Sequence, residues 1–367
     1  MKIFFRISRL GFGGAERVFF SIAEYLSSSH GYEVIFVADT LDGEGVAIAA
    51  EKGFLVRALD VMRTSKSIFA FKRLLEYERP DLVLTAYPDT NGAAILSRFI
   101  SSYKCPIIVT EHASIKQHWA IYPRHWQLRV KLIVKYLYRH ASAVVCVSNG
   151  LKKEVRDLMG SSDQVLTIYN PVRFSSTVSV ARAEHANTDV KTILAVGRLS
   201  KPKDYPTLLK AFALLENKNT CLKIVGGVYD QAVWSELNSL ISDLGIASRI
   251  DFVGYSDHPD LFYQSADLFV LSSAWEGFGN VIVEALAFGV PVVSTDCPSG
   301  PSEILCGGKF GELVPVGDSI ELANRMDRIL SGAIKYNSDD LRRRAQDFSE
   351  KNIGQQYYNL IREVLSG

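Results

Sequence analysis

The chain has 367 residues, of which 47% are hydrophobic and 22% are charged, an ordinary composition for a soluble globular protein. This length is enough for two domains of conventional size. The five cysteines lack the Cys-x-x-Cys or Cys/His spacing of a zinc site, so reduced thiols in a cytosolic protein are expected. No apolar run approaches the roughly 18–20 residues of a spanning helix, and Arg6 and Arg9 interrupt the apolar N-terminus, so neither a membrane span nor a signal peptide is expected.

The formal net charge of +1 hides a difference between the two halves of the chain. Residues 1–170 hold 22 Lys and Arg against 16 Asp and Glu, whereas residues 171–367 hold 19 against 24. Neither half has the strong basic excess of a nucleic-acid-binding protein, so nucleic acid is not expected as a partner. The basic first half favours a membrane surface or a phosphorylated ligand instead.

Short apolar runs alternate with amphipathic stretches along the chain. Strands are predicted at KIFFRI, YEVIFVAD, PDLVLTA, CPIIVTEH and SAVVCVS, and again, later in the chain, at KTILAVGRL, CLKIVGG, RIDFVGY, DLFVLSS and PVVSTD. Apolar strands separated by helices indicate parallel sheets that are covered on both faces. The sequence therefore predicts an α/β protein with two doubly wound, Rossmann-like domains, residues 1–170 and 191–350. The polar, irregular residues 171–190 suit a linker, and residues 351–367 are expected to form a helix that returns to the first domain.

Doubly wound sheets bind ligands at the carboxyl ends of their strands, where loops meet helix N-termini. Gly11, Gly13 and Gly14 follow the first predicted strand, and N–H groups there could hold a phosphate, although such a turn can also be purely structural. The pattern is an incomplete dinucleotide fingerprint, for which only Asp39 could supply the acid. Arg198 and the nearby Lys203 follow the first strand of the second domain.

Two cations at that edge could neutralise a diphosphate, Arg as a fork and Lys as a point charge, although loop cations are more often solvated. Further along, Glu276 and Glu284 flank the turn Gly-Phe-Gly-Asn between a predicted strand and a short apolar helix. Carboxylates at the ligand edge suit sugar hydroxyls, which donate hydrogen bonds to them. The alternative for Glu284 is an ion pair with a neighbouring base.

In their order along the chain, these motifs resemble those of the glycosyltransferase family 4 group, which are GT-B enzymes that use nucleotide sugars. GGAER resembles the N-terminal glycine loop, VTEH the strand that ends in a histidine, VGRL with its following lysine the diphosphate segment, and Glu-x7-Glu the signature pair, while VSNGLKK and IYNPV also match. The resemblance covers essentially the whole chain and implies two Rossmann-like domains that face each other across a cleft. It departs at Asp204, where many members have glycine, which leaves the local loop shape open.

The resemblance implies roles for ten residues. Those with implied catalytic roles are Glu276, Arg198, Lys203 and His112. Those implied to bind the donor are Gly13, Gly14, Glu284, Phe278, Gly279 and Asn280. The two cations would stabilise the leaving diphosphate, the first glutamate would bind the transferred sugar and the second the ribose, and the histidine would lie beside the donor sugar. The sequence contains no Asp-x-Asp motif, so no metal and no cofactor other than the co-substrate are expected.

The implied activity is a retaining transfer of a hexosyl or N-acetylhexosaminyl group from a nucleotide-diphosphate sugar, a UDP-sugar by family habit. STDCPSGPSEIL resembles the corresponding segment of bacterial cell-surface polysaccharide enzymes, so a glycan or a lipid-linked oligosaccharide is expected as acceptor, in lipopolysaccharide or capsule synthesis. The alternatives are a GT-B isomerase, epimerase or phosphorylase, and a non-catalytic relic that binds nucleotide sugars.

Residues 122–140 form a predicted amphipathic helix. At about 100° per residue, one arc carries four cations, and the opposite side carries Trp126, Val130, Ile133, Val134 and Leu137. The four cations are Arg124, Lys131, Lys135 and Arg139. Both a core-packed helix and an interfacial helix fit this pattern. The aromatic residues suit an interface, and they are Tyr122, Trp126, Tyr136 and Tyr138. The expectation is a cytoplasmic protein attached peripherally to the inner face of the cytoplasmic membrane.

Overall fold

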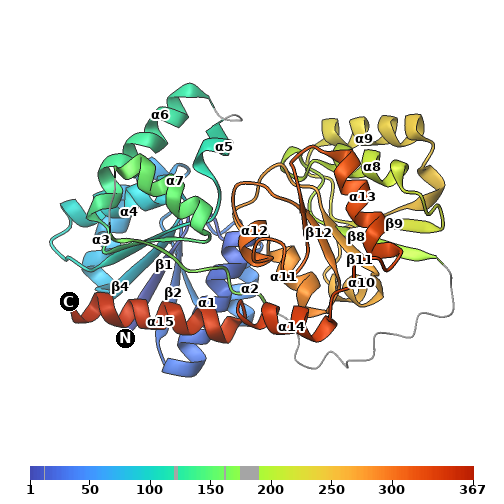
Figure 1. The fold of residues 1–367 in the computed structure, drawn as a ribbon. Helices are drawn as coiled ribbons and strands as arrows, with labels where there is room; N and C mark the ends of the chain where they lie inside the picture. The colour runs from blue at the N-terminus through green and yellow to red at the C-terminus, as the bar shows by residue number, and fades with distance from the viewer. Residues whose placement is uncertain (12, 120–122, 161–162, 174–189) are drawn as a thin grey trace. The chain divides into compact units, whose positions relative to one another are not determined.

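The computed structural model describes residues 1–11, 13–119, 123–160, 163–173 and 190–367 (Figure 1). The chain divides into two compact units. The first comprises Met1–Val172 and Ser349–Gly367, and the second comprises Arg173–Phe348. Residues 174–189, most of the expected linker, lie outside the described residues.

The first unit is built on a seven-stranded parallel sheet. Its strands are β1 (Lys2–Arg6), β2 (Glu33–Ala38), β3 (Leu55–Ala58), β4 (Leu82–Ala86), β5 (Ile107–Glu111), β6 (Ala143–Cys146) and β7 (Val165–Thr167). Their order across the sheet is β3-β2-β1-β4-β5-β6-β7, so the winding reverses between β1 and β4. The connections that leave these two neighbours diverge, and this is the position at which doubly wound sheets bind ligands.

Helices cover both faces of this sheet (Figure 1). They are α1 (Gly14–His30), α2 (Gly45–Glu51), η1 (Thr64–Lys66), α3 (Ser67–Glu78), α4 (Pro88–Ile100), α5 (Ile115–Trp119), α6 (Arg124–Leu132), η2 (Ile133–Leu137), η3 (Tyr138–His140), α7 (Asn149–Met159) and α15 (Glu350–Ser366). Adjacent residues of β1 show the two faces: the Phe5 ring lies 5.1 Å from that of Phe19 in α1, and the Phe4 ring lies 6.4 Å from that of Phe71 in α3. Alternate side chains of a strand point to opposite faces, so an all-apolar strand requires cover on both.

The C-terminal helix α15 belongs to the first unit and packs against α1. Gly354 allows this contact, because a Cβ atom at that position would lie 2.4 Å from the Tyr25 ring. Ile353, Tyr357 and Ile361 of α15 are buried in the same apolar core as Phe5.

The second unit contains a six-stranded parallel sheet. Its strands are β8 (Lys191–Val196), β9 (Thr220–Val225), β10 (Ile250–Gly254), β11 (Leu268–Leu271), β12 (Val292–Thr295) and β13 (Glu312–Val314). The order is β10-β9-β8-β11-β12-β13, so the winding reverses between β8 and β11. Two parallel sheets of this doubly wound kind confirm the predicted α/β fold class.

The helices of the second unit also lie on both faces of its sheet (Figure 1). They are η4 (Lys201–Lys203), α8 (Tyr205–Leu214), α9 (Gln231–Leu244), η5 (Ala247–Arg249), α10 (Asp260–Ser265), α11 (Asn280–Ala287), α12 (Pro301–Ile304), α13 (Ser319–Leu330) and α14 (Ser338–Gln346). Ile193 of β8 shares one core with Phe212 of α8 and Met326 of α13. Phe269 of β11 instead lies 5.8 Å, between ring centroids, from Tyr263 of α10.

The segment expected as one amphipathic helix is helical throughout residues 124–140, but its period changes. The α-helix ends at Leu132 and continues as a π-helical segment, η2, and then as a 3₁₀ turn, η3. Tyr138 is fully buried, and its hydroxyl donates a hydrogen bond to the Glu111 carboxylate. The expectation that Tyr138 belongs to an interfacial aromatic belt is therefore wrong, because a period other than 3.6 changes which side chains share a face. Tyr122 lies outside the described residues.

Candidate active site

In the second unit, the loops that follow β8 and β11 meet at the reversal point of the sheet. The Ser272 hydroxyl donates to the Lys203 carbonyl oxygen over 2.8 Å, and the Ala274 amide donates to the Pro202 carbonyl oxygen over 2.9 Å. These bonds bring together two segments separated by about 70 residues. They position Lys203 Nζ 2.5 Å from Glu276 Oε1, an ion pair between two of the residues that the sequence singled out.

This ion pair is largely enclosed by protein. The Lys203 and Glu276 side chains are 20% and 13% exposed, and the Ser273 hydroxyl donates a second hydrogen bond to the same Glu276 oxygen over 2.7 Å. Burial, followed by the nearby Glu276 charge, raises the pKa of Cys297 to about 12, so this thiol stays neutral. The site thus holds one fixed positive and one fixed negative charge, which can bind a phosphate and a hydroxyl respectively.

Arg198, the other cation of the pair predicted for a diphosphate, lies apart from this ion pair. Its guanidinium carbon is 4.7 Å from the centroid of the Tyr229 ring, and the residue is exposed. Among the residues that the structure describes, it has no ion-pair partner. Stacking on an aromatic face orients the guanidinium without neutralising its charge.

The structure shows how Asp204 is accommodated at a position where the family resemblance predicts glycine. Its backbone adopts the left-handed conformation, with φ 43° and ψ 49°, directly before α8. Its carboxylate accepts a hydrogen bond from the Thr207 hydroxyl over 2.7 Å. Aspartate tolerates this conformation better than most residues, so the loop keeps the shape that a glycine would give it.

The Gly-Phe-Gly-Asn turn leads directly into α11. Gly279 has φ 99°, a conformation that favours glycine, and it immediately precedes the helix. The buried Phe278 side chain packs against Phe348, with ring centroids 5.4 Å apart. Gly300 is also required here, because a Cβ atom at that position would lie 1.7 Å from the Phe278 carbonyl oxygen. The backbone N–H groups of Phe278, Gly279 and Asn280 therefore lie at a helix N-terminus, a position suited to anions.

Glu284 lies on α11, where a tyrosine that the sequence analysis missed hydrogen-bonds it. The hydroxyl of the buried Tyr263 donates to Glu284 Oε2 over 2.8 Å. The Tyr263 ring stacks on Phe288, with centroids 5.6 Å apart and ring planes 10° from parallel. No spacing rule links Tyr263 to Glu284, because only the packing of α10 on α11 brings them together.

In the first unit, His112 follows β5. Its Nε2 lies 2.9 Å from the Thr110 hydroxyl, and the Phe19 ring contacts it edge-on with centroids 6.0 Å apart. Its Nδ1 is buried and has no hydrogen-bond partner among the described residues. Burial lowers the pKa of His112 to about 4, so at neutral pH the imidazole is uncharged. A neutral ring can position a hydroxyl but does not provide a positive charge.

Sequence reasoning did not identify Tyr87, which lies near His112, or Glu16, which contacts Tyr87. Tyr87 follows β4 with φ 73° and ψ 137°, a strained conformation for a residue other than glycine, and its ring centroid is 6.5 Å from that of His112. Its hydroxyl lies 3.5 Å from Glu16 Oε2. The Glu16 carboxylate folds back over the start of α1, where a Cβ atom at Gly13 would be 2.8 Å from it. Gly13 and Gly14 therefore do open the first helix, but a carboxylate lies over its first turn.

Next to His112, Glu111 is the centre of a buried polar network. Its carboxylate accepts hydrogen bonds from the Tyr138 hydroxyl and, over 3.0 Å, from the Asn91 amide. Burial raises the pKa of Glu111 to about 8. This carboxyl is therefore predominantly protonated at neutral pH, and it braces β5, α4 and η3 behind the histidine.

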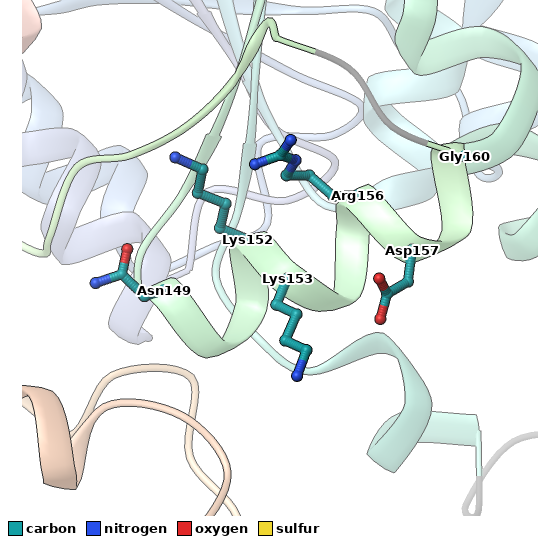
Figure 2. Close-up of a pocket in the computed structure, with 6 residues that line it drawn as sticks. All are labelled: Asn149, Lys152, Lys153, Arg156, Asp157 and Gly160. Carbon is teal, nitrogen blue, oxygen red and sulfur yellow. The ribbon is translucent and has the colours of Figure 1, made fainter.

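Figure 2 shows a basic helix face in the first unit. Lys152 and Arg156 project from one side of α7, and Lys153 and Asp157 from another, around a hollow of about 590 Å³. The described residues that line it all belong to α7 or are the glycine that follows it. The hollow is therefore an open helix surface rather than an enclosed site.

Of the ten residues singled out by the sequence, Gly13, Gly14 and His112 belong to the first unit and the others to the second. Within the second unit, Lys203 and Glu276 are in direct contact, and Phe278 to Asn280 and Glu284 lie on the turn and helix that follow Glu276. Arg198 is held separately by Tyr229.

Two protein-family models match this chain, one over its first half and one over its second half. Residues 12–175 match the model of Glycosyltransferase Family 4, and residues 179–350 match that of Glycosyl transferases group 1. The chain is 27% identical to GalNAc-α-(1→4)-GalNAc-α-(1→3)-diNAcBac-PP-undecaprenol α-1,4-N-acetyl-D-galactosaminyltransferase of Campylobacter jejuni, over 99% of each chain. It is 26% identical to lipopolysaccharide 1,6-galactosyltransferase of Salmonella typhimurium, over 90% of this chain and 89% of that one.

The fold also matches solved structures. The Anabaena protein Alr3699/HepE, solved in complex with UDP, superposes with a TM-score of 0.82 at 23% identity, over 98% of this chain and 99% of that one. Both halves of the chain match glycosyltransferase models, and both sheets have the doubly wound order of the GT-B fold. The chain therefore belongs to the family 4 glycosyltransferases and has the GT-B fold.

Proposed function

We propose that this glycosyltransferase moves a hexosyl or N-acetylhexosaminyl group from a UDP-sugar to a lipid-linked oligosaccharide, with retention of anomeric configuration, during synthesis of a cell-surface glycan such as lipopolysaccharide or capsule. The observation that carries the proposal is the Lys203–Glu276 pair at the reversal point of the second sheet, beside the N-terminus of α11. The lipid-linked acceptor is supported by two similar Campylobacter jejuni proteins whose names include diphospho-undecaprenol or PP-undecaprenol. UDP as the nucleotide is supported by the UDP complex of Alr3699/HepE.

In this proposal, the cations act on the diphosphate. Lys203 exchanges part of its bond to Glu276 for a phosphate oxygen, and Arg198 moves from the Tyr229 ring to form a forked contact. Both then stabilise the negative charge that builds up on the leaving UDP. Because these two side chains and the amides at the start of α11 supply positive potential, the proposed transfer needs no metal ion and no further cofactor.

The carboxylates act on hydroxyl groups. Glu276, together with the backbone N–H groups of Phe278, Gly279 and Asn280, binds the transferred sugar, and Glu284 binds the ribose. The hydrogen bond from Tyr263 fixes the orientation of the Glu284 carboxylate. Fixed acceptors of this kind lose little side-chain entropy when the ligand binds.

The first unit contributes groups that position the substrates. Gly13 and Gly14 offer backbone N–H groups to the phosphates, which requires the Glu16 carboxylate to move aside. Once the side chains that cover it move aside, the buried Nδ1 of His112 binds a hydroxyl of the donor sugar. The leaving phosphate itself takes the proton of the acceptor hydroxyl, so the mechanism uses no protein nucleophile.

Attachment to the inner face of the cytoplasmic membrane is part of the proposal. Its support is the basic surface, defined as Arg124, Lys131, Lys135 and Arg139, all of which are exposed. Leu128, Leu132 and Tyr136 on the same segment are 59%, 46% and 49% exposed, whereas Val130 and Val134 are buried against the first unit. The segment thus packs on the core and still presents apolar and basic groups outward, a combination typical of interfacial helices. Within the described residues, no helix is both long enough and apolar enough to cross a membrane.

The test is an assay of UDP release from a panel of UDP-sugars, with and without a diphospho-undecaprenol-linked oligosaccharide. The expected result is UDP release that depends on the acceptor, with a product whose new linkage has the anomeric configuration of the donor. Interconversion of UDP-sugars without acceptor would favour the isomerase or epimerase. Binding of UDP-sugar without turnover by any acceptor would favour the non-catalytic relic.

A further inference from the structure

A groove in the first unit remains unused by the proposed chemistry. It lies between the η1–α3 segment, α4 and the α6–η2 segment, and has a volume of about 490 Å³. This is within the range of about 300–1,000 Å³ that is usual for ligand pockets. Its apolar lining consists chiefly of Met62, Ile68, Leu96, Ile133 and Leu137. Three segments that are distant in the sequence form the described walls, so the groove is a product of the tertiary packing.

The walls of the groove are anchored to the sheet. Arg6 of β1 is fully buried and forms an ion pair with Asp39, while the Thr64 hydroxyl of η1 donates to the other Asp39 oxygen over 2.7 Å. Arg6 also donates to the Ser67 hydroxyl over 3.0 Å. Asp39, the acid that a dinucleotide fingerprint would need, therefore holds the η1–α3 wall in place instead.

The opposite wall approaches α4 closely because of a glycine. A Cβ atom at Gly92 would lie 3.0 Å from the Ile133 side chain, so only a glycine lets the π-helical segment pack at this distance without adjustment. Ile133 and Leu137, which that segment carries, remain only partly buried and line the groove. Short π-helical segments within helices are often found at functional sites.

Two arginines lie among the lining residues of this apolar groove. Arg129 is 52% exposed and pairs with Asp89 over 2.8 Å, and the Trp126 indole N–H donates to the same Asp89 oxygen over 3.2 Å. Arg63 is exposed and has no ion-pair partner among the described residues. Asp89 also lines the groove, so the charged residues of its lining are two arginines and one carboxylate. This net positive charge beside an apolar floor complements an apolar chain that ends in an anion.

We propose that this groove binds the first isoprene units of the lipid that carries the acceptor, with Arg63 and Arg129 facing its phosphate. The inference rests on the proposed function, in which the acceptor is lipid-linked. The basic surface supplies a second argument, because three of its four residues lie on the same α6–η2 segment that lines the groove. Two apolar side chains of this wall are strongly exposed, namely Met62 before η1 (90%) and Phe69 of α3 (69%). A water-soluble sugar would gain nothing from this surface.

The test measures binding of farnesyl phosphate to the full chain by calorimetry, below the micelle-forming concentration. Geranyl phosphate, farnesol, inorganic phosphate and dioctanoyl phosphatidic acid are the comparison ligands. We expect farnesyl phosphate to bind on the order of tenfold tighter than geranyl phosphate, because one more isoprene unit is buried. Farnesol and inorganic phosphate each lack one half of the recognised chemistry and should bind at least about tenfold more weakly than farnesyl phosphate.

Variants locate the binding. Met62→Glu and Leu96→Glu place a carboxylate on the groove lining and should each weaken farnesyl phosphate binding at least about tenfold. Tyr77→Glu is the matched control, since Tyr77 is 86% exposed on α3 and does not line the groove. Arg63→Ala should weaken binding about tenfold, whereas Lys66→Ala, a cation outside the lining, should not. Near-identical melting temperatures identify the variants that are correctly folded.

Several outcomes would overturn the inference. The first is that the Met62→Glu and Tyr77→Glu variants bind farnesyl phosphate equally well. The second is that the wild type has equal affinity for phosphatidic acid and farnesyl phosphate. The third is that the wild type dimerises and Met62→Glu abolishes the dimer. UDP release from the UDP-sugar panel is measured in parallel. UDP-sugar turnover without farnesyl phosphate binding defeats this inference alone, and the absence of any UDP-sugar turnover defeats the proposed function whether or not farnesyl phosphate binds.

Discussion

Replacing Glu276 by glutamine tests the central feature of the candidate site, namely that one side chain both restrains Lys203 and binds the sugar. Glutamine keeps the size of the side chain and can still accept the hydrogen bond from Ser273. It removes only the negative charge 2.5 Å from Lys203 Nζ. We therefore expect the variant to fold normally, to bind UDP more tightly than the wild type, and to transfer sugar poorly.

The size of the effect follows from the geometry of the pair. At an effective dielectric constant of about 20, two unit charges at the 2.5 Å separation of this pair attract by roughly 7 kcal/mol. Most of this is offset by desolvation, so hydrogen bonds to charged groups contribute only about 1.5–3 kcal/mol to stability. Part of the ion pair persists when the donor binds. We therefore expect that removing the Glu276 charge makes the free energy of UDP binding more favourable by about 1–2 kcal/mol. UDP should then bind roughly 5–30 times more tightly.

Calorimetric titration with UDP measures the affinity, and UDP release from the UDP-sugar measures transfer. The matched control is Glu312→Gln, which also removes a carboxylate from an ion pair in the second unit. The Glu312 side chain is 15% exposed against 13% for Glu276, and Glu312 begins the edge strand β13, where it pairs with Arg325 over 2.7 Å. This control should leave UDP affinity unchanged. Weaker UDP binding by Glu276→Gln, or transfer at the wild-type rate, would refute the reasoning.

Four further predictions follow from the same structure. Tyr263→Phe should weaken UDP binding about tenfold by calorimetry, because it removes the hydrogen bond that orients Glu284. Glu284→Ala should weaken UDP binding at least as much. Unchanged UDP affinity in both variants would place the ribose elsewhere. Arg198→Ala should lower turnover by about 100-fold or more. Sugar transfer by the wild type should continue in the presence of EDTA. Transfer activity that EDTA removes and manganese restores would contradict a metal-free mechanism. Replacing Lys131, Lys135 and Arg139 of the basic surface by glutamate should abolish sedimentation with anionic vesicles at low salt. Salt at 1 M, where the Debye length is about 3 Å, should release the wild type from the vesicles. A wild type that never sediments would show that the segment only packs in the core. Burial raises the pKa of Glu111 from 4.5 to about 8. Its contribution to the free energy of unfolding should therefore be present below pH 4.5 and should be lost as pH rises towards 8, by up to about 1.4 kcal/mol per pH unit. In urea titrations, Glu111→Gln should flatten the dependence of this free energy on pH, and equal slopes for the variant and the wild type would count against the shift.

The sequence by itself determined the fold class and the candidate site residues of the second unit. Apolar runs of strand length alternating with amphipathic helices are local properties of the chain, and a buried parallel sheet is their direct physical consequence. Glycines before a helix and charged residues after a strand could likewise be located by position, since strands of a parallel sheet end at one edge. This is why Lys203 and Glu276 could be selected from short motifs before their contact was known.

The tertiary structure alone decided which of these residues meet. Lys203 pairs with Glu276 because β8 lies beside β11, and Tyr263 bonds Glu284 because α10 packs on α11. The sequence also led to a wrong assignment for Tyr138, since a period of 3.6 residues does not hold through the π-helical segment that turns it towards Glu111. Periodicity reports whether a side chain is buried, whereas the identity of its neighbour depends on strand order and on helix packing, which are set by the whole core at once.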